Sequence, residues 1–512
     1  MSSKDYFRPR GDITTVLDLT DRDSQDNTYF PIDAEQSWFH RTSNQTVYPT
    51  AMSIQEFTQR GPSDWGQTFS FELGSLPAGD LLQGLFLQMK LGSWYDNSVI
   101  NKLLNSVLTT DTAQFANQYW TYINGLGTSI IEYADFIVND QTIERITGEF
   151  IHNHMTLNLD LNAAFGLSTD SIGWIPSSYL NPTSVGQTMF SPNRPYPTEN
   201  GTYFCVLPFF FLRTKLKEVF PLLSCNEGNV RVDVRLRPFS EVVRKYIGYR
   251  ANAADSPLNQ SVSFVSTALP ITTSVISTVA QPPPFRDFRI LTACSLTEGS
   301  LRQKFLKQPF EQMVKLVQNF SFEEPLKYLV SKPNVQSGTV EIQLPLELNH
   351  PVVELMWVFR RKGVRINNEW SNFTPALGFE SNPNKVFPPW LKYATLRING
   401  SEVIAADGDW FRQDISQKHD GGLTSYRSPI YGYSFASYPQ KHQPSGTANM
   451  SRSTSVSLNL TVNIPIAADL STLPSPCAFD PVVTGGWEVF VFAMHYNWLR
   501  FENGLCNRVF SS

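Results

Sequence analysis

The side chains that could carry chemistry in this 512-residue chain are few and dispersed. His152 and His154 stand two residues apart, a spacing that on a β-strand places both imidazoles on one face, with their backbone positions about 7 Å apart. A zinc site would need further cysteine, histidine or carboxylate ligands, and no nearby pattern supplies them. We therefore interpret the pair as ordinary strand or loop histidines, and we expect no metal and no cofactor.

A second candidate is an anion site around Ser445 and Gly446, whose backbone amides are flanked by His442 and Arg452. We favour a structural role, in which Arg452 makes charge-assisted hydrogen bonds that fix the loop or a subunit contact. His350 is likewise expected to hydrogen-bond a turn and not to act as a base. The common nucleotide-binding, zinc-protease and serine-hydrolase signatures are absent. We predict no enzyme and no catalytic residue.

The composition indicates a globular protein with large buried or contacting surfaces. Hydrophobic residues make up 41% of the chain and charged residues only 17%, with a net charge of −5. This balance disfavours direct nucleic-acid binding. No run of about 18 apolar residues predicts a transmembrane helix, and the first residues lack the apolar segment of a secretory signal. The odd number of cysteines, five, predicts reduced structural thiols.

Alternation of apolar and polar residues predicts short β-strands along most of the chain. A regular example covers residues 230–236, where four apolar residues alternate with Arg and Asp. A second covers residues 340–348, where Pro345 restricts the strand to a sheet edge or a bulge. Asn139 and Asp140 tolerate left-handed backbone and predict a hairpin turn. The pattern favours an all-β protein built from sandwiches.

A chain of this length predicts two domains, because a single core rarely extends beyond about 250–300 residues. Segments rich in Ser, Pro, Asn and Gly predict long surface loops between the strands. The expected divisions are an N-terminal arm at 1–26, a first domain at 27–245, a connector or long loop at 246–284, and a second domain at 285–512.

Three segments resemble motifs of one protein family, and they occur in the family's order. Gln443–Arg452 resembles the segment QPSGTxNxSR, Asn349–Val358 resembles NHPxxELxWV, and Tyr496–Arg500 resembles YNxLR. Leu207–Arg213 is similar to the element LPFFFxR. The family is the double jelly-roll major capsid proteins of nucleocytoplasmic large DNA viruses, and the resemblance runs from about residue 28 to the end.

The resemblance implies two tandem eight-stranded antiparallel jelly-roll sandwiches with long loops and a few short helices. It implies a homotrimer that forms a pseudo-hexagonal capsomer of an icosahedral shell, in a virion made and assembled in the host cell cytoplasm. Implied partners are neighbouring capsomers, minor capsid and penton proteins, and a nearby internal lipid membrane. The structural or interface residues that the motifs mark are Pro444, Ser445, Gly446, Thr447, Asn449, Ser451, Arg452, His350, Pro351, Trp357, Tyr496, Asn497 and Arg500.

Two other classes of protein share the β pattern. A carbohydrate-binding jelly roll would bind sugar saturably as a monomer or small oligomer. A cupin-type enzyme would need clustered metal-ligating histidines, and the seven histidines are too dispersed to show such a cluster. Asn-x-Ser/Thr sequences also leave glycosylation open in loops. The candidate glycosylation sites are Asn44, Asn200, Asn259, Asn372 and Asn399.

Overall fold

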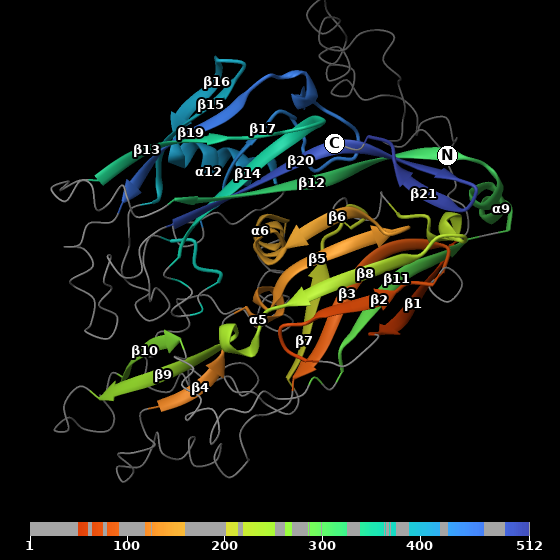
Figure 1. The fold of residues 1–512 in the computed structure, drawn as a ribbon, viewed down its shortest axis with the longest axis horizontal. Coiled ribbons are helices and arrows are strands. Elements are labelled where there is room, and N and C mark those ends of the chain that lie inside the picture. The colour runs from red at the N-terminus through yellow and green to blue at the C-terminus, as the bar shows by residue number, and fades with distance from the viewer. Residues whose placement is uncertain are drawn as a thin grey trace, which may run out of the picture. The chain divides into compact units, whose positions relative to one another are not determined.

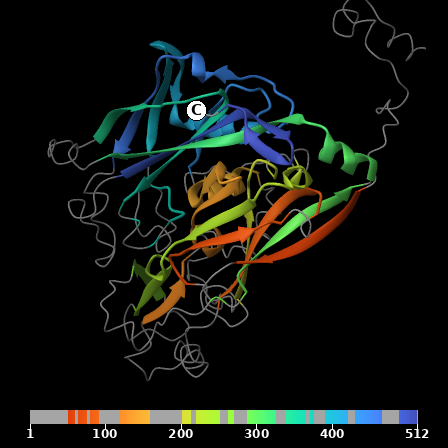
Figure 2. The same ribbon diagram turned by 45° about the vertical axis from the view of Figure 1, so that its right-hand side comes forward.

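The computed structural model describes residues 50–59, 64–74, 79–91, 118–123, 125–158, 201–212, 219–250, 262–268, 285, 287–297, 299–324, 338–362, 364, 368, 370–374, 389–419, 429–464 and 487–510. Antiparallel strands dominate these residues, and helices are short. Figures 1 and 2 show that β12 and the strands after it form a group of sheets separate from that of the earlier strands. The prediction of an all-β fold is confirmed.

Two sheets form the first sandwich. One has the strand order β1-β11-β3-β7, and the other has the order β2-β8-β5-β6. The bounds are β1 Thr50–Thr58, β11 Arg289–Thr297, β3 Leu81–Leu91, β7 Gly201–Leu207, β2 Thr68–Glu72, β8 Val230–Leu236, β5 Ile131–Val138 and β6 Gln141–Thr147. Apolar side chains from both sheets fill the core between them.

The local predictions in this sandwich are confirmed. In β8 every second residue, from Val230 to Leu236, is buried, and the residues between are half-buried. Asn139 and Asp140 adopt φ values of 51° and 61° in the turn that joins β5 to β6. Short polar side chains tolerate this left-handed backbone, which matches the right-handed twist of a hairpin.

The second sandwich also consists of two sheets. The first has the order β12-β20-β14-β17, with β18 paired to β14 and β21 to β20, and the second has the order β13-β19-β15-β16. The bounds are β12 Phe310–Glu324, β20 Trp487–Glu502, β14 Pro351–Arg361, β17 Tyr431–Ser434, β18 Ala448–Asn449, β21 Leu505–Arg508, β13 Gly338–Pro345, β19 Val456–Ile464, β15 Leu391–Ile398 and β16 Ser401–Asp407. Strand β13 lies at a sheet edge, as predicted, because proline cannot donate to a neighbouring strand, but it ends at Pro345 and not at residue 348.

Strand pairing corrects two of the expected domain boundaries. Strand β11 pairs with β1 and β3, so the first sandwich contains a strand from beyond residue 285, where we expected the second domain to begin. The expected connector at 246–284 contains β10, Val262–Ala268, and the end of β9, Val243–Arg250. These strands form a small sheet with β4, Gln118–Tyr122. The arm expected at 1–26 lies outside the described residues.

Short helices join the strands, and one of them overturns an expectation. The helices are α5 Leu126–Ser129, α6 Gly148–Asn158, α9 Gly299–Lys307 and α12 Gly408–Lys418, with 3-10 turns η4 Leu222–Cys225, η5 Phe239–Glu241 and η7 Met450–Arg452. His152 and His154, expected on a strand or loop, belong to α6. Residues two apart on a helix point in different directions, so this spacing does not align the imidazoles.

Candidate functional site

The fold brings the three sequence motifs together on adjacent strands. Residues 438–452, here called the motif loop, contain β18, in which Asn449 lies opposite Pro351 at the start of β14. One residue further along, Val352 lies opposite His495 of β20, directly before the third motif. Three segments that are distant in sequence therefore form one structural unit of the second sandwich.

Hydrogen bonds to the main chain fix the path of the motif loop. The Tyr438 amide donates to the Ser445 hydroxyl at 2.9 Å, and the His350 amide donates to the Ser451 hydroxyl at 2.7 Å. Gly446 has a φ of 148°, and a Cβ there would lie 2.4 Å from the Phe435 carbonyl oxygen. Only glycine fits this position, which explains its place in the motif.

His350 bonds through its backbone, and its side chain has a different role from the one expected. Its carbonyl accepts from the Met450 amide at 3.0 Å, and its own φ is 66°. The imidazole stacks on His495 with ring centroids 5.0 Å apart. Burial, with the nearby charge of Arg508, lowers the pKa of His350. A neutral ring suits this packed position.

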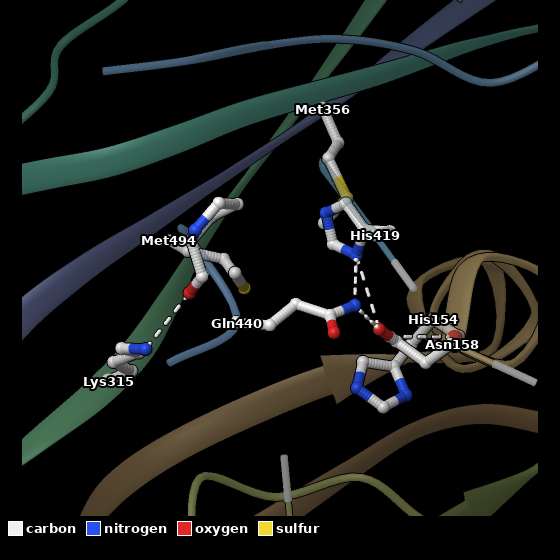
Figure 3. Close-up of a pocket in the computed structure, with 8 residues that line it drawn as sticks. His154, Asn158, Lys315, Met356, His419, Gln440 and Met494 are labelled. Carbon is white, nitrogen blue, oxygen red and sulfur yellow. Dashed lines mark hydrogen bonds between the residues drawn. The ribbon is translucent and has the colours of Figure 1, made fainter. Parts of the chain in front are cut away.

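A buried lysine on β12 makes hydrogen bonds to the backbone of the motif loop. Lys315 of β12, labelled in Figure 3, is 1% exposed. Its ammonium donates to the carbonyl oxygen of Pro439 at 2.9 Å and to that of Lys441. The ammonium also lies 5.6 Å from the ring centroid of Tyr496, its neighbour on β20. A buried charge is costly without such partners. Lys315 therefore ties the loop to the β12–β20 sheet.

Beside Lys315, a buried polar network joins the loop to the first sandwich. His419 Nε2 lies 2.8 Å from the carboxylate of Glu354, which is fully buried. On the other side of the ring, Nδ1 lies 2.9 Å from the Gln440 amide and 3.2 Å from Asn158 Oδ1 (Figure 3). Asn158 ends α6, so this network spans both sandwiches.

A small pocket lies at this point. It is lined by His154, Asn158, Lys315, Met356, His419, Pro439, Gln440 and Met494. Its polar groups are largely engaged with one another, as the preceding contacts show. Among the described residues no group of three or more His, Cys, Asp or Glu side chains is arranged to hold a metal ion.

A buried ion-pair network forms a second link between the sandwiches. Glu149 of α6 accepts from Arg237 at 3.1 Å and from Arg360 of β14 at 2.6 Å, and Arg360 also pairs with Glu488 at 3.0 Å. The Arg237 guanidinium lies 3.8 Å from the ring centroid of Trp370. Burial alone would raise the pKa of Glu149, but the two guanidinium groups outweigh it and lower the pKa to about 2.

Glu144 supplies a third link, because it accepts hydrogen bonds from two backbone amides that belong to different sandwiches. Its carboxylate accepts from Phe210 at 2.8 Å and from Val317 of β12 at 3.1 Å. Phe210 belongs to the predicted LPFFFxR element, whose three phenylalanines are all fully buried. Sequence reasoning missed Glu144, Glu149, Lys315 and Arg360; the only local signal was a charged residue within an apolar strand or beside one.

The remaining motif residues divide into buried and exposed groups. Trp357 is fully buried and packs against Phe411 and Tyr431, and the Asn497 amide donates to the Phe510 carbonyl at 3.0 Å. Tyr496 is also buried, whereas Arg500 pairs with Glu502 at the surface. On the motif loop, the exposed residues include Pro444, Thr447, Asn449 and Arg452.

Arg452 does not fix the motif loop in the way expected. Its side chain is exposed, and among the described residues it makes no hydrogen bond or ion pair. The hydroxyls of Ser445 and Ser451 and the ammonium of Lys315 hold the loop instead. The other role predicted for Arg452, a contact between subunits, stays a prediction.

Burial corrects one of the candidate glycosylation sites. Asn372 is 5% exposed, and its Oδ1 accepts from the Thr374 amide and hydroxyl, so a glycan has no room there. Asn399 is exposed in the turn after β15, and glycosylation there stays a prediction. Asn44, Asn200 and Asn259 lie outside the described residues.

The cysteines of the described residues are buried thiols without disulfide bonds, as expected. They are Cys205, Cys225, Cys294 and Cys506. Burial raises the pKa of Cys205 to about 12 and that of Cys294 to about 11.

None of the helices in the described residues has the length and apolar character needed to cross a membrane.

Comparison with protein-family models identifies the segment that contains all three motifs. Residues 302–507 match the model described as the large eukaryotic DNA virus major capsid protein. The second half of the chain is therefore similar to this family. That range includes the motif loop and all strands of the second sandwich except the last residue of β21.

Relatives in sequence are major capsid proteins as well. The protein of Pyramimonas orientalis virus is 28% identical over 179 residues, which cover 33% of this chain and 39% of the relative. The protein of Paramecium bursaria Chlorella virus 1 is 25% identical over 228 residues, covering 40% of this chain and 49% of the relative. The matched parts thus span less than half of these relatives.

Solved structures extend the similarity of fold to both sandwiches. PBCV-1 VP54 matches with a TM-score of 0.64 at 16% identity, covering 92% of this chain and all of VP54. The Faustovirus major capsid protein matches with a TM-score of 0.58 at 12% identity, covering 96% and 97%. The double jelly-roll architecture is therefore confirmed, while the number of eight strands per sandwich stays a prediction. None of these comparisons supports the carbohydrate-binding alternative.

Proposed function

We propose that this chain is the major capsid protein of an icosahedral virus and that three copies form a pseudo-hexagonal capsomer. The observation that carries the proposal is the convergence of the three capsid motifs at the place where the two sandwiches join. Each chain has two similar sandwiches that are held rigidly together, and each sandwich forms one outer side of the particle. A closed trimer therefore has six similar outer sides. Six similar sides allow a threefold-symmetric particle to pack in a hexagonal lattice.

The contact between the two sandwiches supports this role, because packing of capsomers in a lattice requires a fixed angle between the sandwiches. Three buried links cross it: Glu144 to the β12 backbone, Glu149 to Arg360, and Asn158 to the network of His419 and Gln440. Interfaces between domains that are small and wet allow movement. This one contains buried charges with several partners each, which tolerate little displacement.

Assembly through surfaces explains the protein without catalysis or a cofactor. The partners we propose are neighbouring capsomers, minor capsid and penton proteins, and an internal lipid membrane close to the shell, in a virion assembled in the host cell cytoplasm. The net charge of −5 offers no overall attraction to a genome, so no direct nucleic-acid contact is proposed.

Arg452 is the residue that we assign to the contact between subunits. It is exposed at the rim of a loop whose backbone is fixed by three side chains, so its position is defined before any partner binds. An arginine can bind a carboxylate on a neighbouring copy through two parallel hydrogen bonds. A rigid loop lowers the entropic cost of forming that contact.

The test is the oligomeric state of the purified full-length chain, measured by light scattering after size-exclusion chromatography and by electron microscopy. The wild type is expected at three times the chain mass of 57.9 kDa. Arg452→Ala is expected to dissociate at a concentration at least tenfold higher than the wild type. Arg397→Ala is the matched control, because Arg397 is exposed on β15 of the same sandwich and pairs only weakly with Glu402, at 3.9 Å.

A monomeric wild type at all concentrations would refute the capsomer. A trimer that Arg452→Ala leaves intact would remove Arg452 from the interface and would leave the capsomer standing. Equal weakening by Arg397→Ala would show a general effect of surface charge and not a specific contact.

A further inference from the structure

The C-terminal hairpin of the second sandwich docks onto the first sandwich. Strands β20 and β21 are joined by a turn at Asn503 and Gly504, with φ values of 53° and 76°. The Gly504 carbonyl accepts from the Glu227 amide at 3.2 Å, and a Cβ on Gly504 would lie 2.3 Å from Asn226 Oδ1. The turn therefore fits against residues 226–227 with no space for a larger side chain.

A second contact fixes the strand that follows the turn. The Asn139 side-chain amide, in the β5–β6 turn of the first sandwich, donates to the Cys506 carbonyl at 3.2 Å. Across the β20–β21 ladder, Cys506 lies opposite Phe501, whose ring centroid is 5.7 Å from that of Phe220. Cys506 is thus held in place by both its backbone and its neighbours.

Cys225 ends η4 in the first sandwich and faces this strand. Both Cys225 and Cys506 are fully buried in the same apolar cluster. The η4 turn packs against β21, and Glu227, two residues after Cys225, hydrogen-bonds to Gly504, two residues before Cys506. The influence of the Cys506 side chain on the pKa of Cys225 agrees with this placement of the two thiols, one from each sandwich. The nearby Ser224 hydroxyl donates to the Phe305 carbonyl at 2.9 Å, which holds η4 against the segment that leads into the second sandwich.

We propose that Cys225 and Cys506 form a disulfide that locks the C-terminal hairpin to the first sandwich. Closure of the bond brings the two sulfur atoms to the S–S bond length of about 2.05 Å, within a cluster in which both side chains are already buried. This proposal concerns the isolated chain and does not rest on the proposed capsid function.

The oxidant required is a low-molecular-weight disulfide of the glutathione class. The Cys225 thiolate attacks one sulfur of that disulfide and releases one thiol, forming a mixed disulfide. The Cys506 thiolate then displaces the second thiol and closes the protein disulfide. Two protein thiols lose two electrons in total, and the small disulfide is reduced to two thiols that take up both protons.

Burial determines when this exchange takes place. The neighbouring Cys506 side chain, together with burial, raises the pKa of the Cys225 thiol well above its ordinary value, so little thiolate exists while the hairpin is docked. Exchange therefore proceeds from a state in which the hairpin has opened, or during folding, before the core closes. We expect slow oxidation of the folded protein and faster oxidation at the onset of denaturation.

The disulfide would close a loop of more than half the chain, because it joins residues 225 and 506. Closing a long loop restricts the unfolded chain and so stabilises the folded state. The oxidised protein is expected to melt several degrees higher than the reduced protein. The difference should vanish on addition of a reducing agent.

The experiment counts thiols in the full-length protein. Reduced protein is incubated with a glutathione redox buffer, quenched with acid, unfolded and alkylated, and its intact mass is measured. The chain has five cysteines, so formation of the proposed bond leaves three alkylated cysteines where the reduced protein shows five. Protease digestion without reductant should yield one crosslinked species that contains Cys225 and Cys506.

Matched variants make the result specific. Cys225→Ala and Cys506→Ala should each abolish the crosslinked species and the rise in melting temperature. Cys294→Ala, which removes a buried thiol from β11 of the same core cluster, should leave both unchanged. Five alkylated cysteines in oxidised wild type, or a crosslink between any other pair, would overturn the proposal. Because thiols are counted in unfolded protein, a variant that folds poorly still gives a readable result.

Discussion

The buried carboxylate of Glu149 offers the sharpest test of how the two sandwiches are held together. Its pKa of about 2, compared with the ordinary value of 4.5, corresponds to about 3 kcal/mol of free energy of unfolding. The sign follows from the direction of the shift. A lowered pKa means that the folded state binds the proton less readily, so the stabilisation is present above pH 4.5 and is lost as the pH falls toward 2.

The perturbation is Glu149→Gln, which keeps the size of the side chain and removes its charge. At pH 7 we expect a loss of about 3 kcal/mol, because Arg237 loses its buried partner and Arg360 keeps only Glu488. The assay is urea denaturation between pH 7 and pH 2.5. Wild type and variant should differ most at pH 7, and their free energies of unfolding should converge as the pH falls.

Glu132→Gln provides the control on the neighbouring strand. Glu132 pairs with Arg235 at 3.5 Å, but its side chain is 47% exposed, so its loss should change the stability by less than about 0.5 kcal/mol. The reasoning is refuted if Glu149→Gln is as stable as Glu132→Gln at pH 7. It is equally refuted if the difference between wild type and Glu149→Gln persists unchanged at pH 2.5.

Other predictions concern the motif loop and the surface. Lys315→Met should release the backbone carbonyls of the motif loop and increase its cleavage by protease at least tenfold, measured by limited proteolysis. Gly446→Ala should lower the melting temperature more than Gly400→Ala, because a Cβ at Gly446 meets a carbonyl oxygen whereas nothing lies within 4 Å at Gly400. Protein expressed in a glycosylating host should carry no glycan at Asn372, as judged by peptide mass spectrometry.

For each of these three predictions, a control variant or a contradicting outcome can be stated. Lys362→Met removes an ammonium that pairs with Glu323 at the surface, and it should leave the protease sensitivity of the motif loop unchanged. Equal melting temperatures for the two glycine variants would contradict the close approach at Gly446. A glycan found at Asn372 would show that the segment around it is accessible before or after folding.

Local chemistry explains the predictions that succeeded. The alternation in Val230–Leu236 is enough to define a strand with one buried face, because successive side chains point to opposite sides. The turn at Asn139 and Asp140 follows from side chains that tolerate positive φ. Pro345 identifies an edge strand because it lacks an amide proton. Each of these rules needs only neighbouring residues.

Helix α6 shows a local signal that was available but competed with another pattern. The Thr147 hydroxyl accepts from the Phe150 amide at 3.3 Å, which is the geometry of a helix N-cap, and Glu149 follows in the first turn. The alternating histidines at 152 and 154 suggested a strand instead. Packing between the sandwiches favours the helix, because it buries Glu149 against two arginines.

The sequence by itself determined the all-β class, several individual strands and, through the motifs, the resemblance to the capsid family. Only the tertiary structure decided that β11 belongs to the first sandwich, that Lys315 holds the motif loop while Arg452 remains exposed, and that the segments of Cys225 and Cys506 pack together. The physical reason is the distance along the sequence over which each effect acts. Periodicity and turn preferences act over a few residues, whereas the partner of a strand, a charge or a thiol depends on how distant segments pack.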